Sequence, residues 1–280
     1  MNNVLKNYLD HIGYYRLSAY CLPFEKRAGD QRTHQFVDNT SFDDILKLYI
    51  FDRELRLLIM EAIERIEVSV RNQWAGELSL KTKDSHAYMN ADNFVDLWAH
   101  QRHMSKIASD VKQNKEVFIK HYLNKYQQPF LPPIWAIVET LTLGAFSQWF
   151  CNTKDKKVVQ MIAKNMGLPT AEIIEGVLQP LALIRNICAH HGRLWNRHLV
   201  KKIPYIKKLE PVLKLRINGD QKQPENTLYN YLVVTSHMMK KIQPASTWQE
   251  RLSEKINEAS KEQQKAMGFP NNWQQHPFWL

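Results

Sequence analysis

Apolar residues recur at helical spacing through the first third of the chain. Ser41 can cap a helix, and from Ile45 to Val70 an apolar side chain returns every three or four positions. Two aspartates would lie in the first turn, where the helix dipole favours negative charge. The pattern predicts one long helix over about 42–79.

The same periodicity predicts further helices along the rest of the chain. They cover residues 92–126, 133–150, 155–166, 226–242 and 247–265, and a turn rich in proline precedes the second of them. The candidate core of the first stretch comprises Phe94, Leu97, Trp98, Ile107, Val111, Phe118 and Tyr122.

One more helix is expected between Thr170 and Gly192. Thr170 is a suitable N-cap, and Gly192 can end the helix in the left-handed conformation. Pro180 removes one helix hydrogen bond and clashes with the preceding turn, so it should kink the helix or restart it.

The remaining segments are polar or broken by glycine and proline. Residues 26–32 read as a polar loop and residues 201–225 as a mostly irregular segment. We therefore predict an all-α fold in a single domain. An N-terminal arm covers 1–40, a core bundle 41–200, and a basic segment with C-terminal helices 201–280.

Composition supports a globular protein in a reducing compartment. The hydrophobic fraction of 44% can supply a sizeable core, and no run of about 18 apolar residues could span a membrane. Cys21, Cys151 and Cys188 are widely spaced in apolar contexts, which suits reduced buried thiols. The first residues lack the features of a signal peptide, so we expect a cytoplasmic protein without membrane contact.

The net charge of +10 favours a polyanionic partner, because lysine and arginine displace counterions from phosphates. Such a balance also occurs in proteins without nucleic-acid partners, so the argument depends on the charges clustering. The densest positive run follows residue 192.

Residues 181–198 concentrate polar chemistry at the end of an apolar helical run. Asn186 and His190 share a helix face, while Ile184, Ile187 and Cys188 can point inward. Arg185 stands five positions before His190, so the chain contains the pattern Arg-x4-His.

This pattern resembles the RNase motif of the HEPN superfamily. Its longer form, Arg-Asn-x-Cys-Ala-His-His-x-Arg-Leu-Trp-Asn-Arg at 185–197, resembles the signature of the Abi-like (abortive infection, AbiD/AbiF-type) family. Further landmarks follow in family order at 13–17, 62–71, 133–135 with 141–144, and 267–270 with Trp273.

The resemblance implies a HEPN-like helical bundle and a metal-independent endoribonuclease of a phage-defence or toxin–antitoxin system. It implies restraint by a partner, either a small structured RNA or a protein antitoxin. It also implies a homodimer with a composite site. The alternative is a non-catalytic module that binds RNA or inhibits a protein through the same basic surface.

The resemblance also implies roles for the motif residues. His190 would transfer the proton, Arg185 would clamp the phosphate, and Asn186 would orient the imidazole or a phosphate oxygen. In the alternative interpretation, Arg185 and His190 only hydrogen-bond a helix end into the core. The expected substrate contacts or supports are His191, Arg193, Asn196, Arg197, His198, Lys201, Lys202, Lys207 and Lys208.

Trp195 and three charged residues of the first long helix have two interpretations each. Trp195 would pack in the core or stack on a base. Glu64, Glu67 and Arg71 form either a solvated salt-bridged stripe or a support that faces the motif helix.

A metal site is the competing chemistry. Asp96, His100 and His103 fall at i, i+4 and i+7 on one helical face, and two motif histidines could add ligands. Residues at this spacing on a basic amphipathic helix more often form a solvated face. We expect no metal and no other cofactor.

Helix geometry limits how one chain could build the site. Five residues of separation turn Arg185 and His190 about 140° apart on a straight helix. Either the helix end unwinds, which Pro180 and Gly192 would allow, or a second copy of the chain completes the site.

Overall fold

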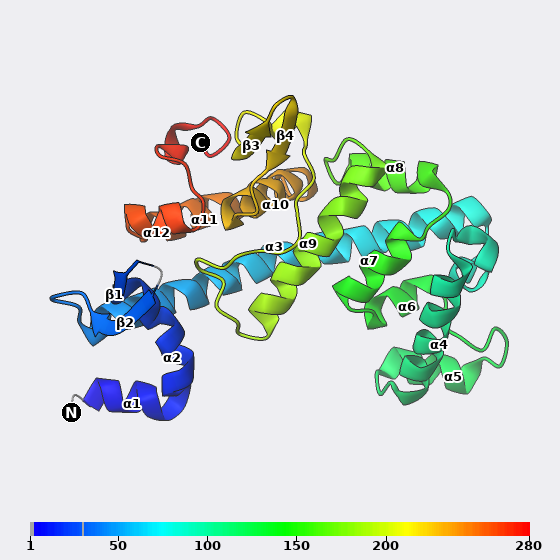
Figure 1. Cartoon of the computed structure of the whole chain (residues 1–280). Helices are drawn as coiled ribbons and strands as arrows, with labels where there is room; N and C mark the ends of the chain where they lie inside the picture. The colour runs from blue at the N-terminus through cyan, green and yellow to red at the C-terminus, as the bar shows by residue number, and fades with distance from the viewer. Residues whose placement is uncertain (1–2, 30) are drawn as a thin grey trace.

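The computed structural model describes residues 3–29 and 31–280 of the chain. These residues form a predominantly helical fold with two small antiparallel hairpins, and the prediction of an all-α protein is confirmed (Figure 1).

The long helix α3 (Phe42–Thr82) is the axis of the molecule (Figure 1). Ser41 and Asp44 form a capping box at its start, and Lys83 ends it in the left-handed conformation. Apolar side chains from Leu55 to Leu78 are buried along its length. The prediction of one long helix is confirmed, because both the period and the cap are local signals.

The N-terminal arm packs on the first half of α3. It consists of α1 (Asn3–Ile12), α2 (Tyr14–Cys21), the short helix η1 (Leu22–Phe24) and a hairpin of β1 (Glu25–Ala28) with β2 (Gln31–Phe36). The expected loop at 26–32 is thus wrong for 26–28 and 31–32 and correct for Gly29, while Asp30 lies outside the described residues. Most of β2 is exposed, so no apolar alternation revealed it.

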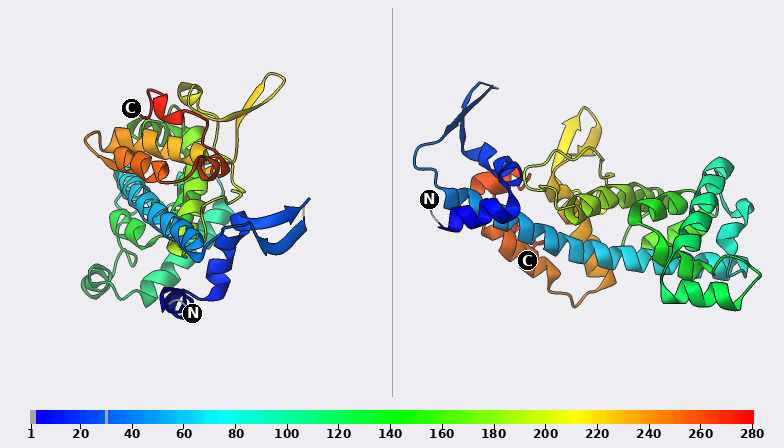
Figure 2. Two further views of the ribbon diagram at one scale, coloured as in Figure 1. Left: turned by 90° about the vertical axis from the view of Figure 1, so that its left-hand side faces the viewer. Right: turned by 90° about the horizontal axis from the view of Figure 1, so that it is seen from below.

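A helical group lies at the other end of α3 (Figure 2, right). It contains the short helices η2 (Ala87–Met89) and η3 (Ala91–Asn93), then α4 (Leu97–Gln113), α5 (Val117–Lys125), α6 (Ile134–Thr140), α7 (Leu143–Cys151) and α8 (Lys156–Asn165). Thr142 caps α7, so the helix expected over 133–150 is divided in two.

The expected core of α4 and α5 is correct in part. Ile107 and Val111 are buried, but the side chains of Leu97, Trp98 and Phe118 are 57%, 79% and 43% exposed. Nine residues turn a helix by half a circle, so Trp98 points away from the face that Ile107 buries.

Helix α9 (Ala171–Ala189) begins after Thr170, whose side chain accepts a hydrogen bond from the Ile173 amide. It crosses α3 and packs on α3, α7 and α8 (Figure 1). The expectation of a restart at Pro180 is wrong, because α9 continues through it. Packing of the buried face, which includes Val177 and Leu181, offsets the cost of about 3 kcal/mol of an internal proline.

The C-terminal part covers the side of α3 opposite the α4–α7 group (Figure 2). It holds the short helix η4 (Lys207–Leu209), a hairpin of β3 (Leu215–Asn218) and β4 (Gln221–Pro224), then α10 (Leu228–Ile242), α11 (Trp248–Asn257), α12 (Lys261–Ala266) and the short helix η5 (Trp273–Gln275). The segment 201–225 is therefore less irregular than expected. None of the helices in the described residues is long and apolar enough to cross a membrane.

The three cysteines are free thiols. Cys188 is buried on α9, and burial raises the pKa of its thiol to about 12. Cys21 and Cys151 are half-buried, so the expectation of buried thiols is correct for one of the three.

Candidate active site

The candidate site lies where α9 ends. The His190 amide donates to the Asn186 carbonyl at 3.0 Å, and the Gly192 amide donates to the Ile187 carbonyl at 2.8 Å. The left-handed residue is His191, with a φ of 56°, so the expectation that Gly192 would adopt that conformation is wrong. A Cβ at Gly192 would approach the Ile187 oxygen to 3.3 Å, so a side chain there would require the turn to shift by a few tenths of an ångström. The turn leaves the side chains of His190 and His191 exposed.

Arg185 sits between solvent and a buried carboxylate. Its side chain is 32% exposed, and its Nε lies 3.8 Å from Oε2 of Glu67 on α3. This Nε is buried and makes no hydrogen bond with the described residues. The contact is an ion pair without a directed hydrogen bond, so the guanidinium keeps donors for a ligand.

Glu67 is shared by two arginines. Arg71, buried one turn later on α3, donates to Glu67 and to the Leu141 carbonyl. That carbonyl lies at the break between α6 and α7. Burial lowers the pKa of Arg71, Glu67 opposes this effect, and the nearby Arg185 charge adds to it.

The structure thus places two of the three expected supports beside the motif helix. Glu67 pairs with Arg185, and Arg71 fixes Glu67. Glu64 is exposed and borders a hollow shared with Gln243 after α10.

A buried aspartate fixes the chain that follows the helix. Asp52 on α3 is fully buried and accepts hydrogen bonds from the backbone amides of Leu194, at 3.2 Å, and Trp195, at 2.6 Å. Tyr20 donates to the same carboxylate at 2.6 Å, and Arg56 pairs with it. Burial and the Asp52 charge raise the pKa of Tyr20.

Helix α2 holds the motif turn from outside. Arg16 donates to the His191 carbonyl at 2.6 Å, and Arg193 donates back to the Ala19 carbonyl at 2.7 Å. Two charged hydrogen bonds, one in each direction, therefore link α2 to residues 191 and 193 of the turn after His190. In the sequence, Arg16 is marked only as part of the landmark at 13–17, and nothing local marks Asp52 as functional.

The family of Abi-like proteins matches residues 7–196, which run from α1 to one residue before the end of the motif. The chain belongs to the Abi-like family. Family membership points to abortive infection, a form of phage defence. Neither the curated proteins nor the solved structures gave a significant match.

The remaining motif residues of this Abi-like protein divide between packing and surface. Trp195 is 2% exposed, so its packing role is confirmed and it is not available to stack on a base. Arg193 is half-buried and used in the contact with α2, whereas Asn196, Arg197 and His198 are exposed.

The positive run of the Abi-like protein leads away from His190. Lys201 donates to the Gln179 side chain at 3.3 Å. Gln179 lies eleven residues before His190, which is about 16 Å along the axis of α9. Burial, together with the charges of Lys208 and Lys240, lowers the pKa of His237, whose ring contacts Gly167 just before α9 begins. Lys207 and Lys208 thus lie toward the far end of α9.

The three residues considered as metal ligands bind to other groups of the protein. Asp96 caps α4, His100 bonds the Tyr88 carbonyl, and His103 bonds Gln148. Within residues 3–29 and 31–280, no group of three or more His, Cys, Asp or Glu side chains is placed to hold a metal ion.

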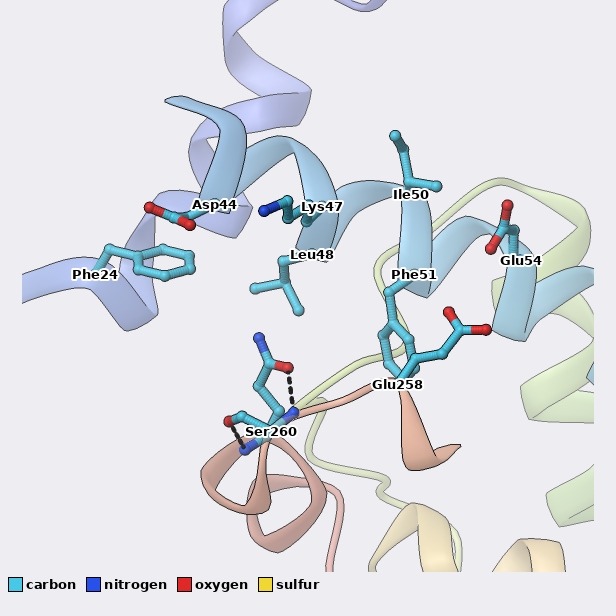
Figure 3. A pocket seen from close by; sticks show the side chains of 10 residues that line it. Phe24, Asp44, Lys47, Leu48, Ile50, Phe51, Glu54, Glu258 and Ser260 are labelled. Atoms are coloured by element: carbon cyan, nitrogen blue, oxygen red, sulfur yellow. Dashed lines mark hydrogen bonds between the residues drawn. The ribbon is translucent and has the colours of Figure 1, made fainter. Parts of the chain in front are cut away.

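A hollow of about 460 Å³ between the start of α3 and residues 258–263 lies apart from the motif (Figure 3). Phe24, Leu48 and Phe51 line it together with carboxylates. Of these, Asp44 belongs to the capping box of α3 and Glu54 pairs with Lys255. None of the motif residues borders this hollow.

Removing the Asp52 carboxylate should destabilise the protein strongly. Asp52→Ala leaves Arg56 buried without its partner and two amides without an acceptor. We expect a loss of about 3–5 kcal/mol in the free energy of unfolding, measured by urea denaturation. Asp52→Asn keeps one acceptor oxygen and should lose less. Equal stability of Asp52→Ala and the wild type would contradict this assignment.

Removing Arg16 should instead affect activity more than stability. Its side chain is exposed, so Arg16→Ala should lower the melting temperature by only a few degrees. Because the His191 carbonyl loses its partner, we expect the RNA cleavage proposed below to fall about tenfold. Arg53→Ala, at an exposed position of α3, is the matched control. Unchanged cleavage by Arg16→Ala would show that α2 does not position the turn.

Proposed function

We propose that this Abi-like protein is a metal-independent endoribonuclease of the HEPN superfamily that acts in the cytoplasm in a phage-defence or toxin–antitoxin system. The observation that carries the proposal is the last turn of α9. It presents an exposed histidine, His190, and a guanidinium, Arg185, that retains free donors beside Glu67.

The two side chains match the chemistry of RNA cleavage by the 2′-hydroxyl. A base removes the hydroxyl proton, and a cation stabilises the extra negative charge on the phosphorane as it forms. Histidine exchanges protons near neutral pH, and arginine stays charged and offers two parallel donors to phosphate oxygens. Asn186, exposed one turn before His190, is available to orient either group.

The intact helix favours a site made by two chains. Because α9 stays helical to Ala189, Arg185 and His190 point about 140° apart, and one phosphate does not meet both from one helix. An isologous dimer would bring Arg185 of one protomer to His190 of its partner. We therefore include a homodimer, with α9 at its interface, in the proposal.

Cleavage of RNA in EDTA tests the reaction directly. Purified protein should cut total RNA or a long transcript with the metal chelated. The products should carry a 2′,3′-cyclic phosphate or 3′-phosphate, since the 2′-hydroxyl is the nucleophile. Products with a 5′-phosphate that form only after magnesium is added would exclude this mechanism in favour of metal-assisted hydrolysis.

A second candidate function is RNA binding without cleavage. It is favoured by the exposed run Arg197, Lys201, Lys202, Lys207 and Lys208, which extends along α9 away from the motif. In this function RNA would still bind to His190→Ala and wild-type protein alike, and the wild type would leave it intact. In either case we propose that a small structured RNA or a protein antitoxin restrains the protein.

A further inference from the structure

A second polar hollow opens beside the tail of the motif. It has a volume of about 260 Å³ and lies between residues 198–202, the β3–β4 hairpin and the segment before α10. Its lining residues are His198, Lys202, Arg216, Gln223, Pro224, Glu225, Asn226 and Thr227. It shares no residue with the Arg185–His190 pair.

The charges around this hollow favour an anion. Lys202 and Arg216 contribute two fixed positive charges. Glu225 is the one carboxylate in the lining, and Lys214 pairs with it at 3.2 Å. The hollow therefore has an excess of positive charge that no lining side chain neutralises.

The walls are held in place by buried contacts. Asn230 of α10 is fully buried, accepts from the Lys214 amide at 2.8 Å, and donates to the carbonyls of Lys214 and Glu225 at 2.7 and 2.8 Å. Both ends of the hairpin are thus tied to α10. Arg216 and Gln223 are cross-strand partners, so their side chains lie on the same face of the hairpin.

Two residues that line the hollow each carry a polar atom that lacks a partner. Asn226 Oδ1 and Thr227 Oγ1 are buried and make no hydrogen bond with the described residues. Thr227 packs so closely on Gly268 that a Cβ there would lie 2.3 Å from the Thr227 Cβ. Thr227 is held against Gly268, whereas rotation of the Asn226 amide toward the hollow would let a ligand hydroxyl satisfy its unpaired acceptor, which otherwise costs free energy.

We propose that this hollow binds a ribose phosphate, the unit shared by an RNA strand and a free nucleotide. Lys202 and Arg216 meet the phosphate, and the ribose 2′-hydroxyl, which a strand and a free nucleotide both carry, donates to Asn226. The volume admits one such unit. No Phe, Tyr or Trp side chain lines the hollow, and the His198 ring stacks on any base alike, so adenine and cytosine nucleotides bind with similar affinity.

The two sources of the ligand are separated by two binding measurements. Calorimetry with 5′-AMP and 5′-CMP on the wild-type protein reports the free nucleotide. Titration of a short single-stranded RNA into the His190→Ala protein reports the RNA strand without cleavage. The RNA measurement rests on the proposed function, whereas the nucleotide measurement stands even if the protein cleaves no RNA.

The decisive variant is Lys202→Gln with Arg216→Gln. We expect it to weaken binding of the nucleotides, the RNA or both about tenfold or more at constant salt. If the variant loses affinity for the nucleotides alone, the ligand is a free nucleotide. If it loses affinity for RNA alone, the ligand is the RNA strand. The matched control is Lys222→Gln, which removes the same type of charge from β4 outside the hollow, where Lys222 pairs with Glu210.

A further variant tests the ribose contact. Asn226→Ala should bind AMP and its 2′,3′-dideoxy analogue equally, whereas the wild type should prefer AMP. Wild-type affinity of the Lys202→Gln, Arg216→Gln protein for both nucleotides and RNA would overturn the proposal. The proposal would also be overturned if neither the nucleotides nor the RNA bound to protein with an intact hollow.

Discussion

His190→Ala is expected to abolish both cell toxicity and RNA cleavage while leaving the protein folded. Loss of a proton-transfer group lowers a rate by about 100- to 10,000-fold. The side chain is exposed at the end of α9, so the free energy of unfolding should change by no more than about 0.5 kcal/mol. Cleavage of a labelled RNA in EDTA and a thermal melt measure the two effects.

Arg185→Ala should give a similar loss of cleavage, by about 100- to 1,000-fold, because the phosphorane loses its cation. Glu67 keeps Arg71 as a partner in this variant, so no carboxylate is left buried and alone. His191→Ala should be milder, because the backbone carbonyl of residue 191, and not its imidazole, is what Arg16 holds.

The control for these variants is His121→Ala, an exposed histidine on α5 at the other end of the molecule. It should retain wild-type toxicity and cleavage. Normal growth arrest by soluble His190→Ala protein would remove this residue from the chemistry.

Co-expression of Arg185→Ala with His190→Ala is expected to restore activity that neither variant has alone. In a composite dimer, half of the assembled dimers would be mixed, and each mixed dimer would retain one intact arginine–histidine pair. The expected activity is about one quarter of that of the wild type. The reason is that Arg185 and His190 point about 140° apart on an unbroken α9, so one chain does not bring both side chains to the same phosphate.

The control pairs His190→Ala with a chain that carries both substitutions. That mixture contains no intact histidine, so it should stay inactive whatever the assembly. A monomer by light scattering at micromolar concentration, together with no rescue in the first mixture, would show that each chain builds its site alone.

The sequence by itself determined the elements whose signals are local. The apolar period and the Ser41 cap gave α3, and Thr170 gave the start of α9. It also placed Arg185 and His190 at a helix end, and the resemblance of the surrounding residues indicated the family that the comparison then showed. Each of these signals lies in one continuous stretch of the chain.

The tertiary structure decided what continues, what breaks and what is buried. Pro180 stays inside α9 because neighbours on three other helices hold that face, while the helix over 133–150 breaks where Thr142 caps α7. Trp98 and Trp195 are equally apolar in sequence, yet one is exposed and the other buried. Only packing distinguishes them.

The residues that support the candidate site, Asp52 and Arg16, could not be predicted from nearby sequence either. Asp52 lies 142 residues before Leu194 in the chain, and Arg16 lies 175 residues before His191. A charged residue on an amphipathic helix is usually solvated, so periodicity gives Asp52 no special place. Its carboxylate is buried because the chain that returns after α9 presents two backbone amides there, and the free energy of those hydrogen bonds exists only once both segments have met.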